Sequence, residues 1–210
     1  MANFKTPFEV EVRCHFETCN ETFKALPFLH SSLQREVSWA GTFYGLKLFK
    51  LGQLLRVSDD VIAGEEPKCF LGWKGRDVGK LANIREELEE EISAEIVNST
   101  ILKRLGGRGR IGARNEIIQE LERLGHHRLM AYQGTSLVGH DEPLGIKVKL
   151  INCPVLKWPI IVEFEKIART EEEARQFEKE LYELSRQLGL ENRLVREEPP
   201  TQLYAAVFET

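Results

Sequence analysis

Carboxylate side chains recur at alternate positions in three widely separated stretches of the sequence. The first stretch, FEVEVR, carries Glu9, Glu11 and Arg13 between Val10 and Val12. Because successive side chains of a β-strand point to opposite faces, the charged residues share one face and the valines share the other. The pattern is typical of a solvated sheet face, but carboxylate oxygens are also the ligands that hard cations such as Mg²⁺ prefer.

Two later stretches repeat this arrangement. IREELEEEI places Glu87 and Glu89 in register with Arg85, and IIVEFEK places Glu163 and Glu165 on one face. Like charges that are neighbours on a sheet face repel each other. Three such rows therefore favour a site in which something neutralises the carboxylates.

Basic residues stand at comparable positions of these and of other strand-like stretches. Arginine binds phosphate oxygens through two parallel hydrogen bonds, and lysine acts as a point charge. Acids and bases on separate strands around one cavity would together suit a polyphosphate with bound metal. The basic residues concerned are Arg13, Arg56, Lys74, Arg85, Arg128, Lys147 and Lys149.

Alternation and turn residues predict a strand-rich chain with a few helices. Besides FEVEVR, strands are expected at residues 34–43, 53–59, 67–75, 81–92, 127–133, 135–139, 146–152 and 160–167, with a last strand at 201–208. Helices are expected at residues 18–33, 93–105, 113–124 and 170–189, the first and last of them opened by capping boxes.

Many antiparallel strands with little parallel crossover predict an α+β protein, with residues 1–210 forming a single domain. We expect about eight strands in a closed or nearly closed antiparallel β-barrel, with helices packed outside. The charged rows would line a tunnel, and the apolar faces would point outward against the helices. The outward set is expected to be Val10, Val12, Leu88, Val162 and Phe164.

Bulk properties limit the classes of function. The 210 residues carry a formal net charge of -4 and 42% hydrophobic residues, which favours a folded core and gives no global argument for nucleic-acid binding. We find no signal-peptide pattern and no apolar run long enough to span a bilayer. The four cysteines form no CxxC pair, so we expect reduced thiols and a cytoplasmic location without a membrane partner.

In order and spacing, these stretches resemble the CYTH domain, the superfamily of triphosphate tunnel metalloenzymes. The N-terminal ExExK strand of that family looks like Glu9-Val-Glu11-Val-Arg13 here. The similarity continues through GQLLRVS around Arg56, FLGWKG around Lys74, REELE from residue 85 to 89, HRLMAY around Arg128, and VEFE at residues 162–165. It covers nearly the whole chain, and six ordered matches are far more specific than ExExK alone.

The resemblance implies roles for the matching positions. It implies that Glu9, Glu11, Glu163 and Glu165 hold a divalent metal, with contributions from Glu87 and Glu89. It implies that Arg56, Lys74, Arg85 and Arg128 bind the triphosphate, to which we add Lys147 and Lys149 from the pattern of basic residues. We assign catalytic roles to Glu9, Glu11, Arg13, Glu163 and Glu165.

Two positions depart from the family pattern. Arg13 stands where the motif has lysine, which keeps the charge but removes a group able to accept a proton. Cys153 stands where the family often has an aspartate before the last acidic pair. Both departures bear on turnover more than on binding.

The activity implied is phosphohydrolysis of a triphosphate with Mg²⁺ or Mn²⁺, resting on positioning and charge neutralisation. Hydrolysis is favoured because water needs no separate nucleoside pocket. One alternative is a class IV-type adenylate cyclase that makes cyclic AMP from ATP, and a second is a non-enzymatic polyphosphate or nucleotide binder. We expect a small-molecule triphosphate as the ligand of a monomer or homodimer.

Overall fold

The computed structural model describes residues 6–93 and 97–208. Contacts group this part of the chain into two compact units. Unit 1 comprises residues 6–38, Val78–Arg85 and 134–208, and unit 2 comprises Trp39–Asp77 and Glu86–Gln133. Three strands run from one unit into the other, and the prediction of a single domain stays a prediction.

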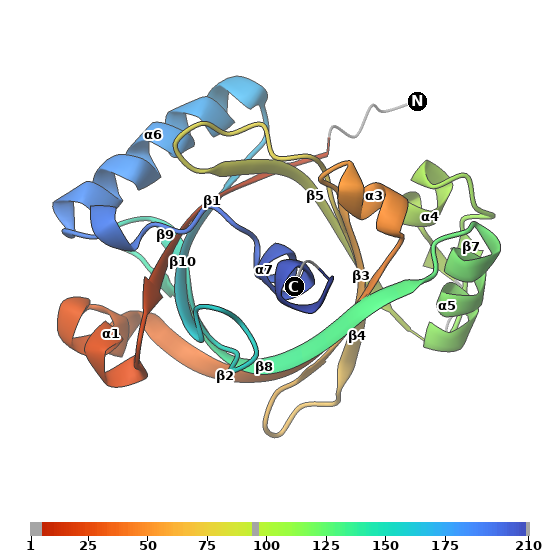
Figure 1. Ribbon diagram of the computed structural model, residues 1–210, viewed down its shortest axis with the longest axis horizontal. Coiled ribbons are helices and arrows are strands. Elements are labelled where there is room, and N and C mark those ends of the chain that lie inside the picture. The colour runs from red at the N-terminus through yellow and green to blue at the C-terminus, as the bar shows by residue number, and fades with distance from the viewer. Residues whose placement is uncertain (1–5, 94–96, 209–210) are drawn as a thin grey trace. The chain divides into compact units, whose positions relative to one another are not determined.

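Eight strands form one sheet in the order β1-β10-β9-β8-β2-β3-β4-β5, and this order closes on itself (Figure 1). The paired strands β1–β10, β10–β9, β9–β8, β3–β4 and β4–β5 are antiparallel. The strands are β1 (Phe8–Phe16), β2 (Leu33–Tyr44), β3 (Leu54–Val61), β4 (Lys68–Lys74), β5 (Asn83–Ile92), β8 (Arg128–Asp141), β9 (Ile146–Asn152) and β10 (Ile160–Ala168). The α+β class and the closed antiparallel sheet of about eight strands are confirmed.

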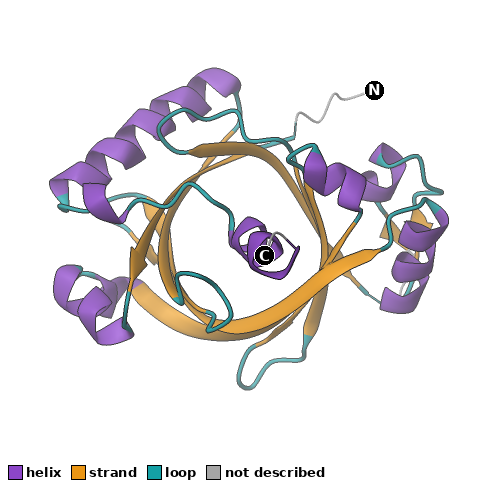
Figure 2. Cartoon of the chain, viewed as in Figure 1, coloured by secondary structure: helices purple, strands orange, loops and turns teal. Residues whose placement is uncertain are grey.

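In unit 1, helix α6 (Glu171–Gln187) covers the apolar face of β1 and β10 (Figure 2). Thr170 caps the helix by accepting a hydrogen bond from the N–H of Glu173, as the capping box predicted. Leu181 packs in one buried cluster with the apolar residues of both strands, which include Val10, Val12, Val162 and Phe164. Those four residues therefore lie on the helix-covered face, as expected.

Unit 2 has its own core around β3 and β4. Helices α4 (Thr100–Arg104) and α5 (Arg114–Arg123) contribute Ile101 and Ile117 to a cluster that also holds Val57 and Leu71, with Leu88 packed against it. A short helix α3 (Leu46–Lys50) and the paired strands β6 (Val97–Asn98) and β7 (Arg110–Ile111) complete the unit. These three short elements were not predicted from the sequence.

Two helix predictions need correction. The helix expected at 18–33 is two helices, α1 (Cys19–Ala25) and α2 (Leu29–Ser32), because Pro27 has no N–H to continue the first one. The helix expected at 93–105 begins only at α4, where the Ser99 hydroxyl accepts a hydrogen bond from the N–H of Leu102. Residues 94–96 of that prediction lie outside the described residues. Conversely, the two strands expected at 127–139 are the single strand β8.

The strand expected at 201–208 is wrong, because this segment forms helix α7 (Pro199–Phe208) after a short 3-10 turn η1 (Glu191–Arg193). Pro199 and Pro200 occupy its first turn, where the missing N–H of proline costs no hydrogen bond. The N–H groups of Thr201 and Gln202 both donate to the backbone oxygen of Glu198. Within the described ranges, no helix is long and apolar enough to cross a bilayer.

Candidate functional site

The charged face of β1 and β10 in unit 1 brings together five predicted site residues. Glu11 lies directly opposite Glu165 in the register, and Arg13 lies opposite Glu163, while Glu9 precedes them on the same face of β1. All five side chains are buried, with 6% or less of each residue exposed. The alternation in the sequence therefore did not produce a solvated face, and it placed charges in the interior of the unit.

Arg13 is the centre of this cluster. Its Nε donates a hydrogen bond of 2.9 Å to Oε1 of Glu163, and its Nη2 contacts the carboxylates of Glu11 and Glu198, the latter at 2.9 Å. Burial alone would lower the pKa of Arg13, but the carboxylates of Glu198 and Glu163 raise it above the ordinary value. The guanidinium therefore stays charged at any practical pH and cannot act as a base.

Strand β9 adds two lysines beside the glutamates of β10. Nζ of Lys147 lies 2.9 Å from both carboxylate oxygens of Glu165, and Nζ of Lys149 lies 3.2 Å from Oε2 of Glu163. The lysine side chains are 52% and 31% exposed, whereas their glutamate partners are buried. The two ammonium groups are thus accessible to an anion from solvent.

The start of β5 contributes Arg85, which is buried. Its Nε lies 2.9 Å from Oε1 of Glu198.

The segment that leads into β5 is held by α6. Oε1 of Glu178, a buried side chain on that helix, accepts hydrogen bonds from the N–H groups of Lys80, Leu81 and Ala82. Although burial alone would raise the pKa of Glu178, these hydrogen bonds lower it below the ordinary value.

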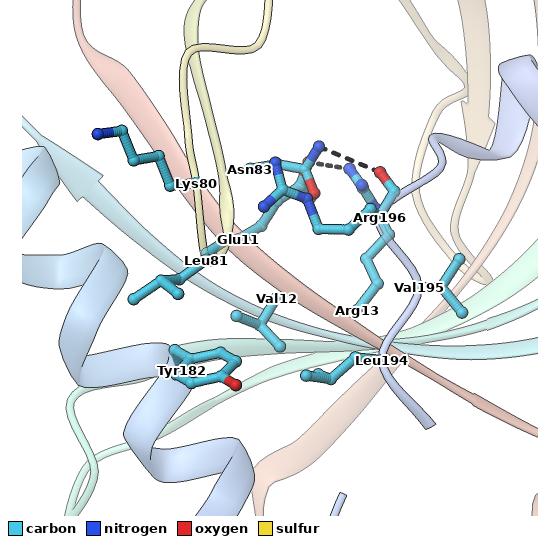
Figure 3. A pocket seen from close by; sticks show the side chains of 11 residues that line it. Glu11, Val12, Arg13, Lys80, Leu81, Asn83, Tyr182, Leu194, Val195 and Arg196 are labelled. Carbon is cyan, nitrogen blue, oxygen red and sulfur yellow. Dashed lines mark hydrogen bonds and ion pairs between the residues drawn. The ribbon is translucent and has the colours of Figure 1, made fainter. Parts of the chain in front are cut away.

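A pocket of about 250 Å³ opens beside this cluster, between β1, the segment before β5, α6 and the chain that follows η1. Figure 3 shows Glu11 and Arg13 in contact there, with Asn83 and Arg196 next to them. The side-chain amide of Asn83 donates to the backbone oxygen of Arg196 at 3.2 Å. Lys80 and Tyr182 line the same pocket from outside the charged face.

In unit 2, charged residues of β3, β4 and β5 form a second row. Nη2 of Arg56 lies 2.8 Å from Oε2 of Glu89, and Nζ of Lys74 lies 3.6 Å from Oε1 of Glu87. Gly72 faces Arg56 across β3 and β4, and a Cβ at this glycine would lie only 3.2 Å from the arginine side chain. The glycine of FLGWKG thus leaves room for the guanidinium.

This second row is more open than the face in unit 1. The side chains of Arg56 and Glu89 are 37% and 42% exposed. Arg128, at the start of β8, is exposed as well. The prediction that both rows line one tunnel stays a prediction, as do the roles assigned to the individual residues.

The carboxylates suit Mg²⁺ or Mn²⁺ in donor chemistry, because hard divalent ions take carboxylate oxygens. Their present partners are basic side chains, however, with Arg13 between Glu11 and Glu163 and a lysine on Glu165. Among residues 6–93 and 97–208, no three Asp, Glu, His or Cys side chains form a ready ligand set. A divalent ion would therefore have to replace basic partners of these glutamates.

Glu198 is the site residue that the sequence did not reveal. It belongs to no alternating stretch, and the only local signal is that an acidic pair precedes Pro199 and Pro200.

Cys153 was predicted to mark a departure from the family pattern. It is fully buried after β9, where its N–H donates to the backbone oxygen of Pro159, and burial raises the pKa of its thiol.

Comparison with known proteins identifies the fold through solved structures alone. No family model matches the chain. No curated protein matches it either.

Several solved structures share the fold over nearly the whole chain. PH1819 protein from Pyrococcus horikoshii superposes with a TM-score of 0.73 at 19% identity, covering 94% of this chain and 99% of its own. A "putative adenylate cyclase" from Vibrio parahaemolyticus gives 0.66 at 14% identity, covering 94% and 98%. HpAC1 from Hippeastrum, a "putative adenylyl cyclase" described as having a dominant triphosphatase activity, gives 0.56 at 16% identity, covering 91% and 90%. The chain therefore has the fold that the resemblance to the CYTH domain implied.

Proposed function

We propose that the protein is a phosphohydrolase that acts on a triphosphate. The observation that carries this proposal is the charged face of β1, β10 and β9, where buried glutamates and Arg13 lie beside the accessible ammonium groups of Lys147 and Lys149. A face that carries both basic and acidic side chains can rearrange its ion pairs when a polyanion binds. The basic side chains then contact the phosphates, and the carboxylates become available to a metal.

The names of proteins with this fold support the same class of substrate. Two of the structures described above are named as adenylate or adenylyl cyclases, and one of these is described as having a dominant triphosphatase activity. ATP and other triphosphates share the chain of phosphates that Arg and Lys side chains recognise. We favour hydrolysis over cyclisation, because water requires no pocket for a nucleoside.

In this proposal, the basic residues bind and orient the phosphates. Lys147 and Lys149 would contact the ligand first, since they are the accessible bases of the face in unit 1. The buried Arg85 would contact it further from solvent. In unit 2, Arg56, Lys74 and Arg128 would bind further phosphate oxygens. Arg13 would contribute positive charge and no proton transfer, because its guanidinium neither gives up nor accepts a proton at working pH.

The acidic residues would hold Mg²⁺ or Mn²⁺ that arrives with the triphosphate. Glu9, Glu11, Glu163 and Glu165 would be the ligands in unit 1, and Glu87 and Glu89 would contribute from unit 2. When bound, such an ion neutralises phosphate charge and polarises the bond that breaks. The glutamates orient the complex relative to the basic residues.

The test is phosphate release from tripolyphosphate, ATP and thiamine triphosphate with Mg²⁺ or Mn²⁺, with a matched series in EDTA. Release from at least one triphosphate, abolished by the chelator, is the expected result. Cyclic AMP produced from ATP would instead identify a cyclase. Binding of tripolyphosphate without any release would identify a polyphosphate binder, a function that Arg13 favours, because its guanidinium cannot accept a proton during turnover.

We further propose that the chain acts in the cytoplasm as one domain, as a monomer or homodimer, with no nucleic-acid or membrane partner. Gel filtration with light scattering checks the oligomeric state. A mass above that of two chains would contradict it.

A further inference from the structure

The chain after η1 crosses β1 and enters the charged face. Leu194 forms a β-bridge with Cys14, and the N–H of Val195 donates a 2.9 Å hydrogen bond to the backbone oxygen of Arg13. The next two residues, Arg196 and Glu197, are exposed, whereas Glu198 is buried again. Helix α7 follows on the side of β1 and β10 opposite to α6 (Figure 1). The C-terminal segment thus reaches the same surface as the predicted site.

The carboxylate of Glu198 lies between two guanidiniums. Its Oε2 is 2.9 Å from Nη2 of Arg13, and its Oε1 is 2.9 Å from Nε of Arg85. The side chains of Arg13, Arg85 and Glu198 are 1%, 10% and 5% exposed. Two arginines that share one oxyanion in a buried place form the arrangement that proteins use to bind phosphate.

The fit of Glu198 to this pair is incomplete. Nη1 of Arg13 is buried with no hydrogen-bond partner among the described residues. A phosphoryl group carries three oxygens in a tetrahedral arrangement, whereas a carboxylate has two in a plane. A phosphate could therefore satisfy this donor, which Glu198 does not.

We infer that Arg13 and Arg85 form an oxyanion subsite for one phosphoryl group of the ligand, and that Glu198 closes this subsite until the ligand displaces it. The inference rests on the proposed function for the identity of the ligand, a triphosphate. It adds that the subsite is regulated, because the segment from Glu198 through α7 competes with the triphosphate for the two arginines. The displaced carboxylate would move to solvent, where its charge is hydrated.

The charges around Glu198 favour its replacement by another anion over its simple removal. Glu198 is the carboxylate that Arg13 and Arg85 share. Removal of its charge takes one carboxylate partner from both guanidiniums in a buried place, which makes the entry of another anion more favourable. An incoming phosphate would take over these two contacts.

The first experiment compares Glu198→Gln with the wild-type protein by calorimetric titration with tripolyphosphate in EDTA at fixed ionic strength. The substitution keeps the side-chain volume, and Arg13 retains Glu11 and Glu163 as partners, so the fold should survive. We expect about tenfold tighter binding, because the variant lacks the competing charge. The matched control, Glu197→Gln, makes the same charge change at the exposed neighbour and should bind within about twofold of wild type.

The outcomes separate this inference from the proposed function. Tighter binding by Glu198→Gln supports the inference even if no triphosphate is hydrolysed. Equal or weaker binding by Glu198→Gln, with wild-type hydrolysis intact, overturns the inference alone. No binding by either protein in EDTA, with triphosphate hydrolysis in Mg²⁺ or Mn²⁺ intact, overturns the inference alone, and no binding together with no hydrolysis overturns both.

A second measurement uses the unmodified protein, so it does not depend on the folding of a variant. Hydrogen–deuterium exchange is followed with and without tripolyphosphate in EDTA. A ten-residue helix without packing partners is marginal in water, so displacement should make the amides of Thr201–Phe208 exchange faster. The amides of α6 should be unaffected. Unchanged or slower exchange in α7 at saturating tripolyphosphate overturns the inference.

Discussion

Arg13 and Glu163 face each other directly across β1 and β10, and Nε of Arg13 donates a 2.9 Å hydrogen bond to Oε1 of Glu163. Oε2 of the same glutamate lies 3.2 Å from Nζ of Lys149 on β9. Glu163 therefore bridges a buried guanidinium and an accessible ammonium group. Through this position, the interior of the charged face is connected to the part that a ligand can reach.

Replacing Glu163 by Gln is expected to preserve the fold and to reduce triphosphate hydrolysis by about a hundredfold or more, the loss typical for a positioned electrostatic group. Raised Mg²⁺ or Mn²⁺ should restore part of the activity if the residue holds metal. Rates measured against metal concentration, with circular dichroism for folding, check this. Glu142→Gln, at a side chain that is 88% exposed, is the control. Wild-type kinetics in Glu163→Gln would remove this residue from the site.

Replacing Arg56 by Ala is expected to weaken triphosphate binding about tenfold, because a phosphate would lose a charge-assisted hydrogen bond. Added metal should not restore it. The exposed pair with Glu89 contributes little to folding, roughly 1 kcal/mol at most. KM for tripolyphosphate, measured at several metal concentrations, checks the prediction.

Arg104→Ala is the matched control for Arg56. The side chain of Arg104 is also 37% exposed, and it pairs with Glu86, on the face of β5 opposite to Glu87 and Glu89. The control variant should keep the KM of the wild type. An equal rise of KM in both variants would show that general surface charge, and no specific site, attracts the ligand.

Replacing Glu178 by Gln is expected to destabilise the protein by about 2 kcal/mol, since a buried carboxylate that accepts three backbone N–H bonds loses its charge. Urea unfolding measures the effect. Glu180→Gln, which removes an exposed partner of Lys166 from the same helix, should cost less than about 1 kcal/mol. Equal effects of the two variants would contradict the role of Glu178 in holding the segment before β5.

The stability contributed by Glu178 should also depend on pH. Because its folded-state pKa is lowered, the contribution is fully present above the pKa of the unfolded state. It is lost as the pH falls through the folded-state pKa. The stability difference between wild type and Glu178→Gln should therefore be largest near neutral pH and shrink in acid. A difference that grows in acid would have the wrong sign.

Alkylation by iodoacetamide at pH 7.5 is expected to modify Cys19 first. Burial raises the pKa of Cys14 to about 12, and burial together with Asp59 raises that of Cys69 to about 12, so both remain thiols. Cys153 is fully buried, whereas Cys19 is partly exposed. Mass spectrometry of peptides after timed labelling gives the order, with urea-unfolded protein as the control. Faster labelling of Cys14 than of Cys19 would contradict the described burial.

The strands could be predicted from the sequence because their side-chain period is visible within each stretch. Both valines of FEVEVR lie in the core beneath α6, and Glu163 and Glu165 lie together on the opposite face of β10. The direct pairing of β1 with β10 was not predicted, because strands far apart in the sequence find each other only in the tertiary structure. What the pattern could not show is that Arg13 and the lysines of β9 already neutralise these acids, because ion pairs depend on the register between strands.

The C-terminal segment shows where sequence reasoning fails. The stretch at residues 201–208 has apolar and aromatic residues that suit a strand, but a strand needs an edge with which to pair, and this segment folds as α7. The burial of Glu198 depends on the path of the chain past Cys14, which no local pattern encodes. Loop segments of this kind acquire their role only from tertiary structure.

The contacts of Arg13 also bear on how sequences with this fold can diverge. Its three carboxylate partners come from β1, from β10 and from the segment before α7, so a change at any one position alters the charge balance felt by the others. A lone replacement of Arg13 by an uncharged residue would leave several buried acids without their shared counter-charge. Positions 13 and 198 should therefore covary among related sequences. Residues other than arginine should occur at position 13 mainly in those sequences that have lost the acidic residue at position 198.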